Sequence, residues 1–253
     1  MRVYTAALVS LALTISGCAP DRHAPPFAQK PYEAFSRHDA AAIAMDEWRL
    51  FGMRVDDNDD AGYVQTSTTM AERQPGLWQR IGEYWWEGLN ADDPDNAWTG
   101  KHNAQGQVFP VAVNGRYAWS AAFISYVMRT AGAGKNFPYA ADHAHYINAA
   151  ALAAKGEIAN PLLIAEDPKT YAPRLGDLVC LGRGHARSLT FADLPTANIF
   201  PAHCSIVVAG AVDQISVIGG NVEDAVTMTH VPVNNSGMVG PPWFVVLRVM
   251  YLR

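Results

Sequence analysis

The sequence predicts an α+β fold in which helices come first along the chain and an antiparallel sheet follows. Three segments, 36–52, 74–90 and 119–131, carry apolar residues at helical spacing, and a fourth helix is expected from Asp142 onward. Beyond Gly156 the sequence changes to short, β-branched runs separated by turn residues. This order of elements favours α+β over a fold with alternating helices and strands.

The predicted helices have recognisable starting residues. Ser36 or Asp39 can cap the first helix, and Asp142 can cap the last one. The helix at 74–90 has a stripe of large apolar side chains, which favours burial in a core over a sugar-stacking platform. The stripe consists of Leu77, Ile81, Tyr84, Trp85 and Leu89.

Five runs in the second half of the chain are expected to form the sheet. Asp177, in the first run, is interpreted as holding a turn or strand end rather than taking part in chemistry. A turn between the second and third runs brings their far ends together. The runs are residues 176–182, 203–212, 214–221, 225–233 and 243–252.

The composition fits one globular domain, which we place at residues 36–253. The chain has 253 residues, of which 49% are hydrophobic and 17% charged, so a sizeable core is expected. The formal net charge is −5. A mildly acidic chain argues against nucleic acid as a partner, because nucleic-acid binding requires a clustered basic surface.

The first 17 residues resemble a bacterial lipoprotein signal peptide, and we assign residues 1–17 to it. Arg2 supplies the positive charge, and the apolar stretch 3–15 is too short for an ordinary membrane span. Small residues precede Cys18, as in a lipobox, so Cys18 is the expected lipidation site. A plain secretory signal with an incidental cysteine is the alternative.

The residues after the lipidation site predict where the protein is anchored. Ala19 stands where an inner-membrane retention signal usually has Asp, which implies the periplasmic face of the outer membrane in a Gram-negative cell. Several acyl chains together anchor a protein stably, so the membrane is an expected partner. Residues 18–35 are rich in Pro and polar side chains and are predicted to form an extended tether.

Cys180 and Cys204 are the two remaining cysteines. An exported chain can oxidise them to a disulfide, but two buried thiols are the favoured interpretation. Cys204 is disfavoured as a nucleophile because it neighbours His203 on a predicted strand, and successive side chains point to opposite faces.

Three polar residues occupy positions suited to nucleophilic catalysis. Ser120 lies at the start of an apolar helix, where N–H groups and the helix dipole favour negative charge. His203 opens a strand and Asn221 follows the next one, so these two are expected to be neighbours. A nucleophile, a base and a group that orients the base are then available. Each also has a structural interpretation: a helix cap, a surface histidine and a turn residue.

Four motifs together resemble the NlpC/P60 and CHAP-like hydrolases, which are related to papain, and the DUF2272 family in particular. The resemblance covers residues 75–253. It implies a papain-like domain with the nucleophile at Ser120, the catalytic histidine at His203 and the polar third residue at Asn221. The motifs are "WSAAFISYVMRTAG", "PRLGDLVCLG", "HCSIVVAG" and "VIGGNVEDAV".

The sequence departs from those hydrolases at the nucleophile, where Ser120 replaces a cysteine. A cysteine acts as a thiolate paired with imidazolium, whereas a serine needs neutral His203 to remove its proton during attack. Ser120 is therefore interpreted as a nucleophile, with a relic of a lost cysteine and a plain helix cap as the alternatives.

Other residues are expected to border the same cleft. His143 and Trp119 are interpreted as substrate contacts. His143 and His145 are two apart on a helix and would not chelate together, so neither a metal site nor a cofactor is predicted. The Gly-rich, basic segment 181–188 can flank the groove and meet an acidic substrate, or it is a mobile connection.

The sequence thus predicts a lipid-anchored envelope protein that hydrolyses amide bonds, and the resemblance implies that these bonds are in peptidoglycan peptides. Ser120 would attack, His203 would act as base and then acid, and Asn221 would orient the imidazole. The alternative is a catalytically inactive module that holds peptidoglycan or an envelope partner in the same groove. An esterase or acyl transferase is a further alternative.

Overall fold

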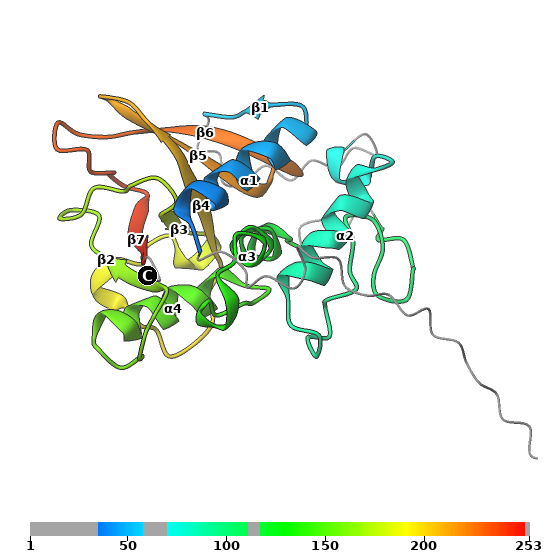
Figure 1. Cartoon of the computed structure of the whole chain (residues 1–253), viewed down its shortest axis with the longest axis horizontal. Coiled ribbons are helices and arrows are strands. Elements are labelled where there is room, and N and C mark those ends of the chain that lie inside the picture. Colours follow the sequence, from blue (N-terminus) through cyan, green and yellow to red (C-terminus); the bar gives the residue numbers. More distant parts are fainter. Residues whose placement is uncertain (1–34, 58–69, 111–116, 251–253) are drawn as a thin grey trace, which may run out of the picture. The chain divides into compact units, whose positions relative to one another are not determined.

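The computed structural model describes residues 35–57, 70–110 and 117–250 (Figure 1). The chain divides into two compact units, Met1–Tyr32 and Glu33–Arg253, and the fold below is that of the second. The predicted signal peptide, the lipidation site Cys18 and all but the last residue of the predicted tether lie outside the described residues. No helix of the described ranges is long and apolar enough to cross a membrane.

Four α-helices are present in the described ranges, and their starts confirm the predicted caps. The Ser36 side chain accepts a hydrogen bond from the Asp39 amide at 3.3 Å, and Asp142 accepts one from the His145 amide at 2.7 Å. Both bonds satisfy an amide that has no partner inside its own helix. The helices are α1 (Arg37–Leu50), α2 (Leu77–Gly88), α3 (Ser120–Thr130) and α4 (His143–Ala154).

A seven-stranded sheet follows most of the helices, which confirms the α+β class. The strand order is β1-β6-β5-β4-β3-β7-β2. The prediction of a purely antiparallel sheet was wrong, because the edge strand β1 pairs with β6 in parallel. The strands are β1 (Arg54–Val55), β2 (Leu163–Glu166), β3 (Leu178–Gly182), β4 (Ala202–Gly210), β5 (Gln214–Val222), β6 (Ala225–Pro232) and β7 (Trp243–Val249).

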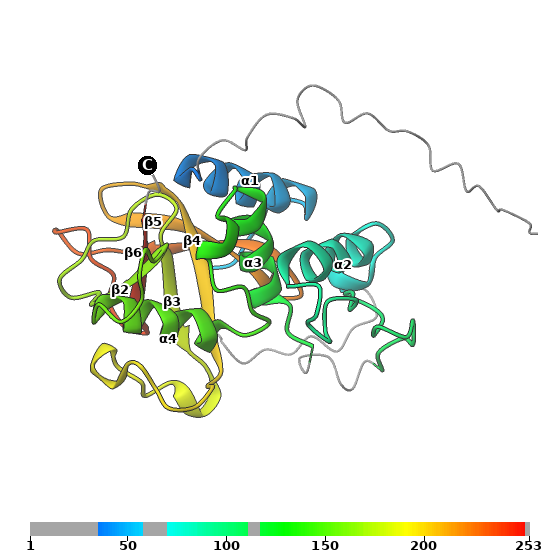
Figure 2. The ribbon, with the colours of Figure 1, turned by 60° about the horizontal axis from the view of Figure 1, so that its bottom comes forward.

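Helix α3 is the centre of the helical layer (Figure 2). It packs against α2 and α1 and against strands β4 and β5, and all its residues from 120 to 128 are buried. Helix α4 packs on β2 and β4. The buried apolar residues of α3 belong to the main core of the protein. A second, separate apolar cluster contains Val179, Val207, Val217, Val231 and Val246. The N-terminus of α3 is therefore held by packing on several sides.

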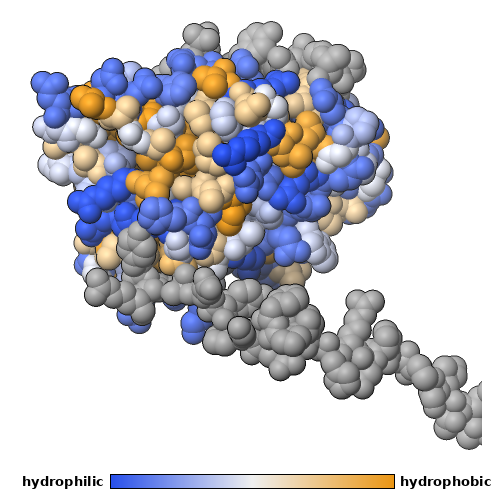
Figure 3. All heavy atoms as spheres, turned by 45° about the horizontal axis from the view of Figure 1, so that its top comes forward, coloured by the Kyte–Doolittle hydropathy of each residue, from blue (hydrophilic) through white to orange (hydrophobic). Residues whose placement is uncertain are grey.

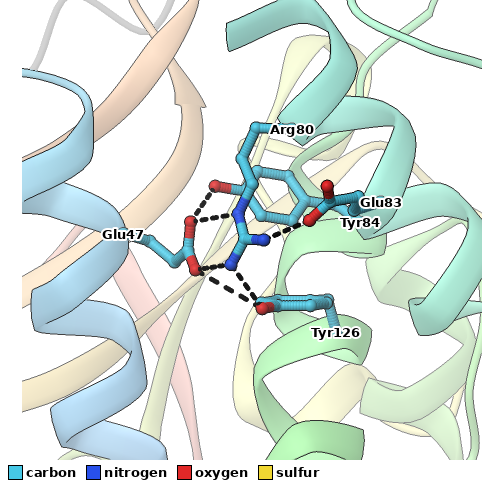
Figure 4. Close-up of polar contacts among 5 residues, drawn as sticks. All are labelled: Glu47, Arg80, Glu83, Tyr84 and Tyr126. Carbon is cyan, nitrogen blue, oxygen red and sulfur yellow. Dashed lines mark hydrogen bonds and ion pairs between the residues drawn. The ribbon is translucent and has the colours of Figure 1, made fainter. Parts of the chain in front are cut away.

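A partly buried ion-pair network, with the buried Glu47 at its centre, joins α1, α2 and α3 (Figure 4). Glu47 accepts hydrogen bonds from Arg80 Nε at 2.9 Å and from the Tyr84 hydroxyl at 2.6 Å. Arg80 also donates to the Tyr126 hydroxyl at 2.5 Å and pairs with Glu83. The bond to Glu47 is the main reason that the pKa of Arg80 is raised. Such a network fixes helix positions because removing one partner leaves an uncompensated buried charge.

Asp177 confirms its predicted structural role at the start of β3. Its carboxylate accepts hydrogen bonds from the amides of Arg174 and Val249 and from the Tyr171 hydroxyl, each at 2.9 Å. The side chain has no exposed surface. It therefore joins the turn before β3 to the end of β7.

Cys180 and Cys204 form a disulfide, so the interpretation as two thiols was wrong. They lie directly opposite each other on the neighbouring strands β3 and β4, with 4.1 Å between their Cα atoms. A one-residue difference in strand register would have separated them, and the sequence does not specify register at that level. The disulfide also removes Cys204 as a free nucleophile.

Exposed apolar side chains are scattered between hydrophilic ones on the face shown in Figure 3. Among all large apolar side chains of the described residues, on whichever face they lie, the most exposed are Val212 at 96%, Ile199 at 70% and Trp86 at 62%. Isolated exposed apolar residues of this kind are normal for folded proteins and do not mark a site.

Candidate functional site

The candidate site begins at the N-terminus of α3, where Trp119 occupies the capping position and Ser120 is the first helical residue. Trp119 makes no side-chain cap, and the Ser120 hydroxyl is hydrogen-bonded elsewhere. The interpretation of Ser120 as a plain helix cap was therefore wrong. The first N–H groups of the helix, including those of Ser120 and Ala121, have no acceptor within it and form an electropositive end.

Ser120 is paired with His143, the first residue of α4. The distance from Ser120 Oγ to His143 Nε2 is 2.7 Å. One turn along α4, the Tyr146 hydroxyl forms a short hydrogen bond with His143 Nδ1. Ser120 is 7% exposed and His143 is 4% exposed, so this chain of three side chains is nearly enclosed.

Burial keeps both His143 and Tyr146 uncharged. Burial, followed by the charge of Arg183, lowers the pKa of His143 to about 3. Burial, followed by the charge of Asp142, raises the pKa of Tyr146 well above its usual value. His143 is therefore a neutral imidazole at physiological pH, with one nitrogen protonated and the other able to accept a proton.

A second serine–histidine pair lies beside the first. The His203 and His143 rings are 5.4 Å apart between centroids, and His203 Nε2 lies 3.1 Å from Ser205 Oγ. Burial, then the charges of Arg183 and His143, lowers the pKa of His203 well below its usual value. A Cβ atom at Gly219 would lie 2.6 Å from His203 Nε2, so this position must be glycine for the ring to fit.

The predicted trio of Ser120, His203 and Asn221 is only partly brought together. The histidine that contacts Ser120 is His143, and His203 stands next to His143. Asn221 lies in a bulge of β5 with a positive φ of 57°, a conformation that Asn tolerates better than most residues. Among the hydrogen bonds of the described ranges, none joins Asn221 to either histidine. Tyr146 instead contacts Nδ1 of His143, and Ser205 contacts Nε2 of His203.

Trp119, predicted to contact substrate, instead belongs to the core. It is 1% exposed, and its indole N–H donates to Glu72 Oε2 at 3.0 Å. Burial, then the charge of Asp224, raises the pKa of Glu72 to about 7. Burial is also the main reason that the pKa of Asp224 is raised to about 6. The buried Glu72 thus contacts the residue before Ser120, and the partly buried Asp224 acts on Glu72.

Residues 72–249 match the model of a family described as uncharacterized protein conserved in bacteria (DUF2272). The chain belongs to the DUF2272 family. No curated protein and no solved structure matches it. The match begins at Glu72 and ends at Val249, so the DUF2272 region includes both serine–histidine pairs, while α1 lies before it.

Sequence reasoning missed several polar residues of this DUF2272 site. Tyr146 had a usable signal, because with Asp142 as cap it lies three residues after His143 on a helix and shares a face with it. Ser205 and Glu72 had none, because the first depends on which face of β4 is used and the second lies in the 3₁₀ turn η2 (Ala71–Arg73). Groups of three or more potential metal ligands are absent from the part of the chain that the structure describes.

Proposed function

We propose that the protein hydrolyses amide bonds in the bacterial cell envelope, with Ser120 as nucleophile and His143 as base. The observation that carries this proposal is the 2.7 Å contact between Ser120 Oγ and His143 Nε2 at the N-terminus of a buried helix. Serine and neutral imidazole in contact are the two groups that acyl transfer requires. The amides of Ser120 and Ala121 lie at the helix end that would receive the oxyanion.

The proposed reaction passes through an acyl-enzyme. Ser120 Oγ attacks the carbonyl carbon while His143 Nε2 takes the hydroxyl proton. The imidazolium then gives that proton to the amide nitrogen, the C–N bond breaks, and an ester remains on Ser120. Water, deprotonated by His143, hydrolyses the ester and restores the hydroxyl. The oxyanion arises together with the imidazolium, so their charges offset each other inside the buried site.

The tautomer of His143 decides whether Ser120 is prepared for attack. If the Tyr146 hydroxyl donates to Nδ1, the proton of neutral His143 is on Nε2 and is donated to Ser120. If Nδ1–H donates to the Tyr146 oxygen, Nε2 accepts the proton of the Ser120 hydroxyl. The hydrolase uses the second arrangement.

The papain-like fold, the lipid anchor at Cys18, the outer-membrane location and peptidoglycan peptides as substrate belong to the same proposal. The order of the four motifs supports them, as do the α+β fold with Ser120 at a helix start and the disulfide, which forms in oxidising compartments. An oxidised, exported protein meets peptidoglycan before any cytoplasmic substrate.

A fluorophosphonate probe, which labels activated serines, tests the proposal. We expect labelling of wild type, loss of labelling in Ser120→Ala, and retention in Ser205→Ala, whose serine also contacts a histidine. Turnover of purified sacculi should follow the same order. Labelling that persists in Ser120→Ala would contradict the assignment of the nucleophile.

The second candidate is a non-catalytic module that holds a peptidoglycan peptide or an envelope partner. The near-complete burial of Ser120 and His143 favours it, because a purely structural hydrogen bond needs no access. The ¹⁵N chemical shifts of His143 separate the two candidates. A proton on Nδ1 supports the hydrolase, and a proton on Nε2, donated to Ser120, supports the binding module.

A further inference from the structure

Among the described strands, the end of β4 that carries His203 pairs with β3 alone. The ladder between β4 and β5 begins at Ile206, whereas the ladder between β4 and β3 continues to Ala202. His203, Cys204 and Ser205 therefore have β3 as the strand partner that fixes their backbone. The position of the second histidine of the site thus depends on how β3 is held.

Strand β3 is itself irregular at this point. Its pairing with β7 shifts register between Cys180 and Leu181, and Leu181 lies opposite His203. The disulfide between Cys180 and Cys204 falls at the same place. It holds the two Cα atoms 4.1 Å apart, closer than the roughly 4.5 to 5.5 Å usual for facing residues of antiparallel strands. The disulfide therefore sets the spacing of β3 and β4 one residue from His203.

The His203 ring has close neighbours that a shift of β4 would disturb. Its Nε2 atom lies 3.1 Å from Ser205 Oγ, and a Cβ atom at Gly219 would lie only 2.6 Å from Nε2. The ring also packs against that of His143, with 5.4 Å between centroids, and His143 Nε2 lies 2.7 Å from Ser120 Oγ. A change in the spacing of β3 and β4 would therefore reach the Ser120–His143 pair through the contact between the two rings.

We propose that the disulfide is a redox switch that sets the positions of His203 and His143. In the reduced chain, β3 and β4 relax to the usual spacing and the two rings lose their fixed arrangement. The reduced chain stays folded, because the other residue pairs of β3 with β4 and β7 do not depend on the bond. This inference rests on the proposed function, since the pair that it controls is that of Ser120 and His143.

The switch closes when Cys180 and Cys204 together lose two protons and two electrons. The electron acceptor is another disulfide, which is reduced to two thiols as the new S–S bond forms through a mixed disulfide. Oxidants of this class act outside the cytoplasm, where disulfides form and persist. A hydrolase with this switch is inactive before export and becomes competent after it.

The full chain, purified in detergent, is compared in two redox states. Glutathione disulfide gives the oxidised state. Because both cysteines are buried, the reduced state is prepared with dithiothreitol in urea, the urea is removed, and free thiols are counted. We expect reduction to slow fluorophosphonate labelling by about 10- to 100-fold, the effect of a misplaced catalytic group. Reoxidation should restore the rate.

Nuclear magnetic resonance and circular dichroism measure the same two states without turnover. We expect reduction to shift or broaden the ring signals of His143 and His203 while the circular dichroism spectrum stays unchanged. The indole N–H signal of Trp119, which donates to Glu72, is the internal control and should stay in place. Histidine signals that do not change would overturn the inference, as would unfolding of the reduced chain, because the bond would then act on stability alone.

Cys180→Ser/Cys204→Ser is the matched control for the reductant. It should behave like reduced wild type and give the same labelling rate with and without dithiothreitol. Wild type that is labelled equally fast in both redox states would overturn the switch. Absence of labelling in both states would instead contradict the hydrolase, and the histidine signals would then decide alone whether the disulfide positions the site.

Discussion

Trp119 and Ser120 are consecutive residues whose side chains contact opposite kinds of buried group. Ser120 contacts His143, whose ring adjoins that of His203, and these two residues are the histidine side. Trp119 contacts Glu72, on which the charge of Asp224 acts, and these two residues are the carboxyl side. Burial is the main cause of every pKa shift on both sides, and it favours the neutral form in each case. It therefore keeps the histidines unprotonated and the carboxyl groups inclined to keep a proton.

The two sides make opposite contributions to the pH dependence of stability. Histidines with lowered folded pKa values bind more protons when unfolded, so their side loses stability as pH falls below about 6.5. Carboxyl groups with raised folded pKa values bind more protons when folded. Their contribution is present below the unfolded pKa and is lost as pH rises through about 7 for Glu72 and about 6 for Asp224. In the pH range where both kinds of group titrate, the change in stability from the histidines offsets the change from the carboxyl groups.

The largest expected difference between the sides is in turnover. His143→Gln should lower kcat by about 10² to 10⁴, the range for removing a general base. Glu72→Gln should lower it far less, because the Gln carbonyl can still accept the Trp119 N–H. Ester hydrolysis measured alongside circular dichroism checks this, and equal losses in two folded variants would mean that both sides act only through structure.

The disulfide next to His203 should matter more for stability than any single group on the carboxyl side. Cys180 and Cys204 are 24 residues apart in sequence, and closing a loop of that length stabilises the folded state by about 3.5 kcal/mol through the entropy of the unfolded chain. The free energy of unfolding of Cys180→Ser/Cys204→Ser, measured by urea denaturation, should be lower than that of wild type by about this amount. Reducing conditions should lower the free energy of unfolding of wild type by the same amount and leave that of the variant unchanged. This result would attribute the loss of stability to the disulfide.

The opposite pH trends can be separated with Glu72→Gln. Wild type loses stability through Glu72 as pH rises from 4.5 to about 7, by up to about 3 kcal/mol for a shift of this size. The free energy of unfolding of Glu72→Gln, relative to wild type, should therefore increase over this pH range. Urea denaturation from pH 4 to 8 measures it.

Two further variants sharpen this pH experiment. Glu157→Gln removes one negative charge from an exposed position after α4 and controls for net charge. His203→Gln should give the reverse trend and gain stability relative to wild type as pH falls below about 6.5. If Glu72→Gln and His203→Gln changed with pH in the same direction, the opposition between the two sides would be refuted.

The difference between the sides also shows what a sequence can reveal. Helix periodicity and cap residues predicted four helices, and β-branched runs predicted five of the seven strands, because these are local signals. Strands β1 and β2 have two and four residues and carry too little pattern. The sequence pointed to Ser120 and His203, but the pairing of Ser120 with His143 depends on how α4 packs beside α3. Glu72 was missed because only long-range packing buries it.

The smallest predicted effect concerns the turn that carries Asp224. Val222 pairs with Ala225, and the two residues between them have positive φ values, 49° for Glu223 and 57° for Asp224. Such two-residue turns favour Gly and Asn, and a left-handed conformation costs other residues about 1 kcal/mol. Glu223 is exposed, so Glu223→Gly should stabilise the protein by about 0.5 to 1 kcal/mol.

Glu223→Ala separates strain from charge at this turn, because it removes the carboxylate and keeps the Cβ atom. We expect no comparable gain from it in thermal unfolding. Equal gains from Gly and Ala would instead mean that Glu223 destabilises the turn through repulsion of Asp224, whose pKa its charge helps to raise. In that case the carboxyl side would also include Glu223 on the hairpin surface, and its contribution to the pH dependence of stability should weaken in both variants.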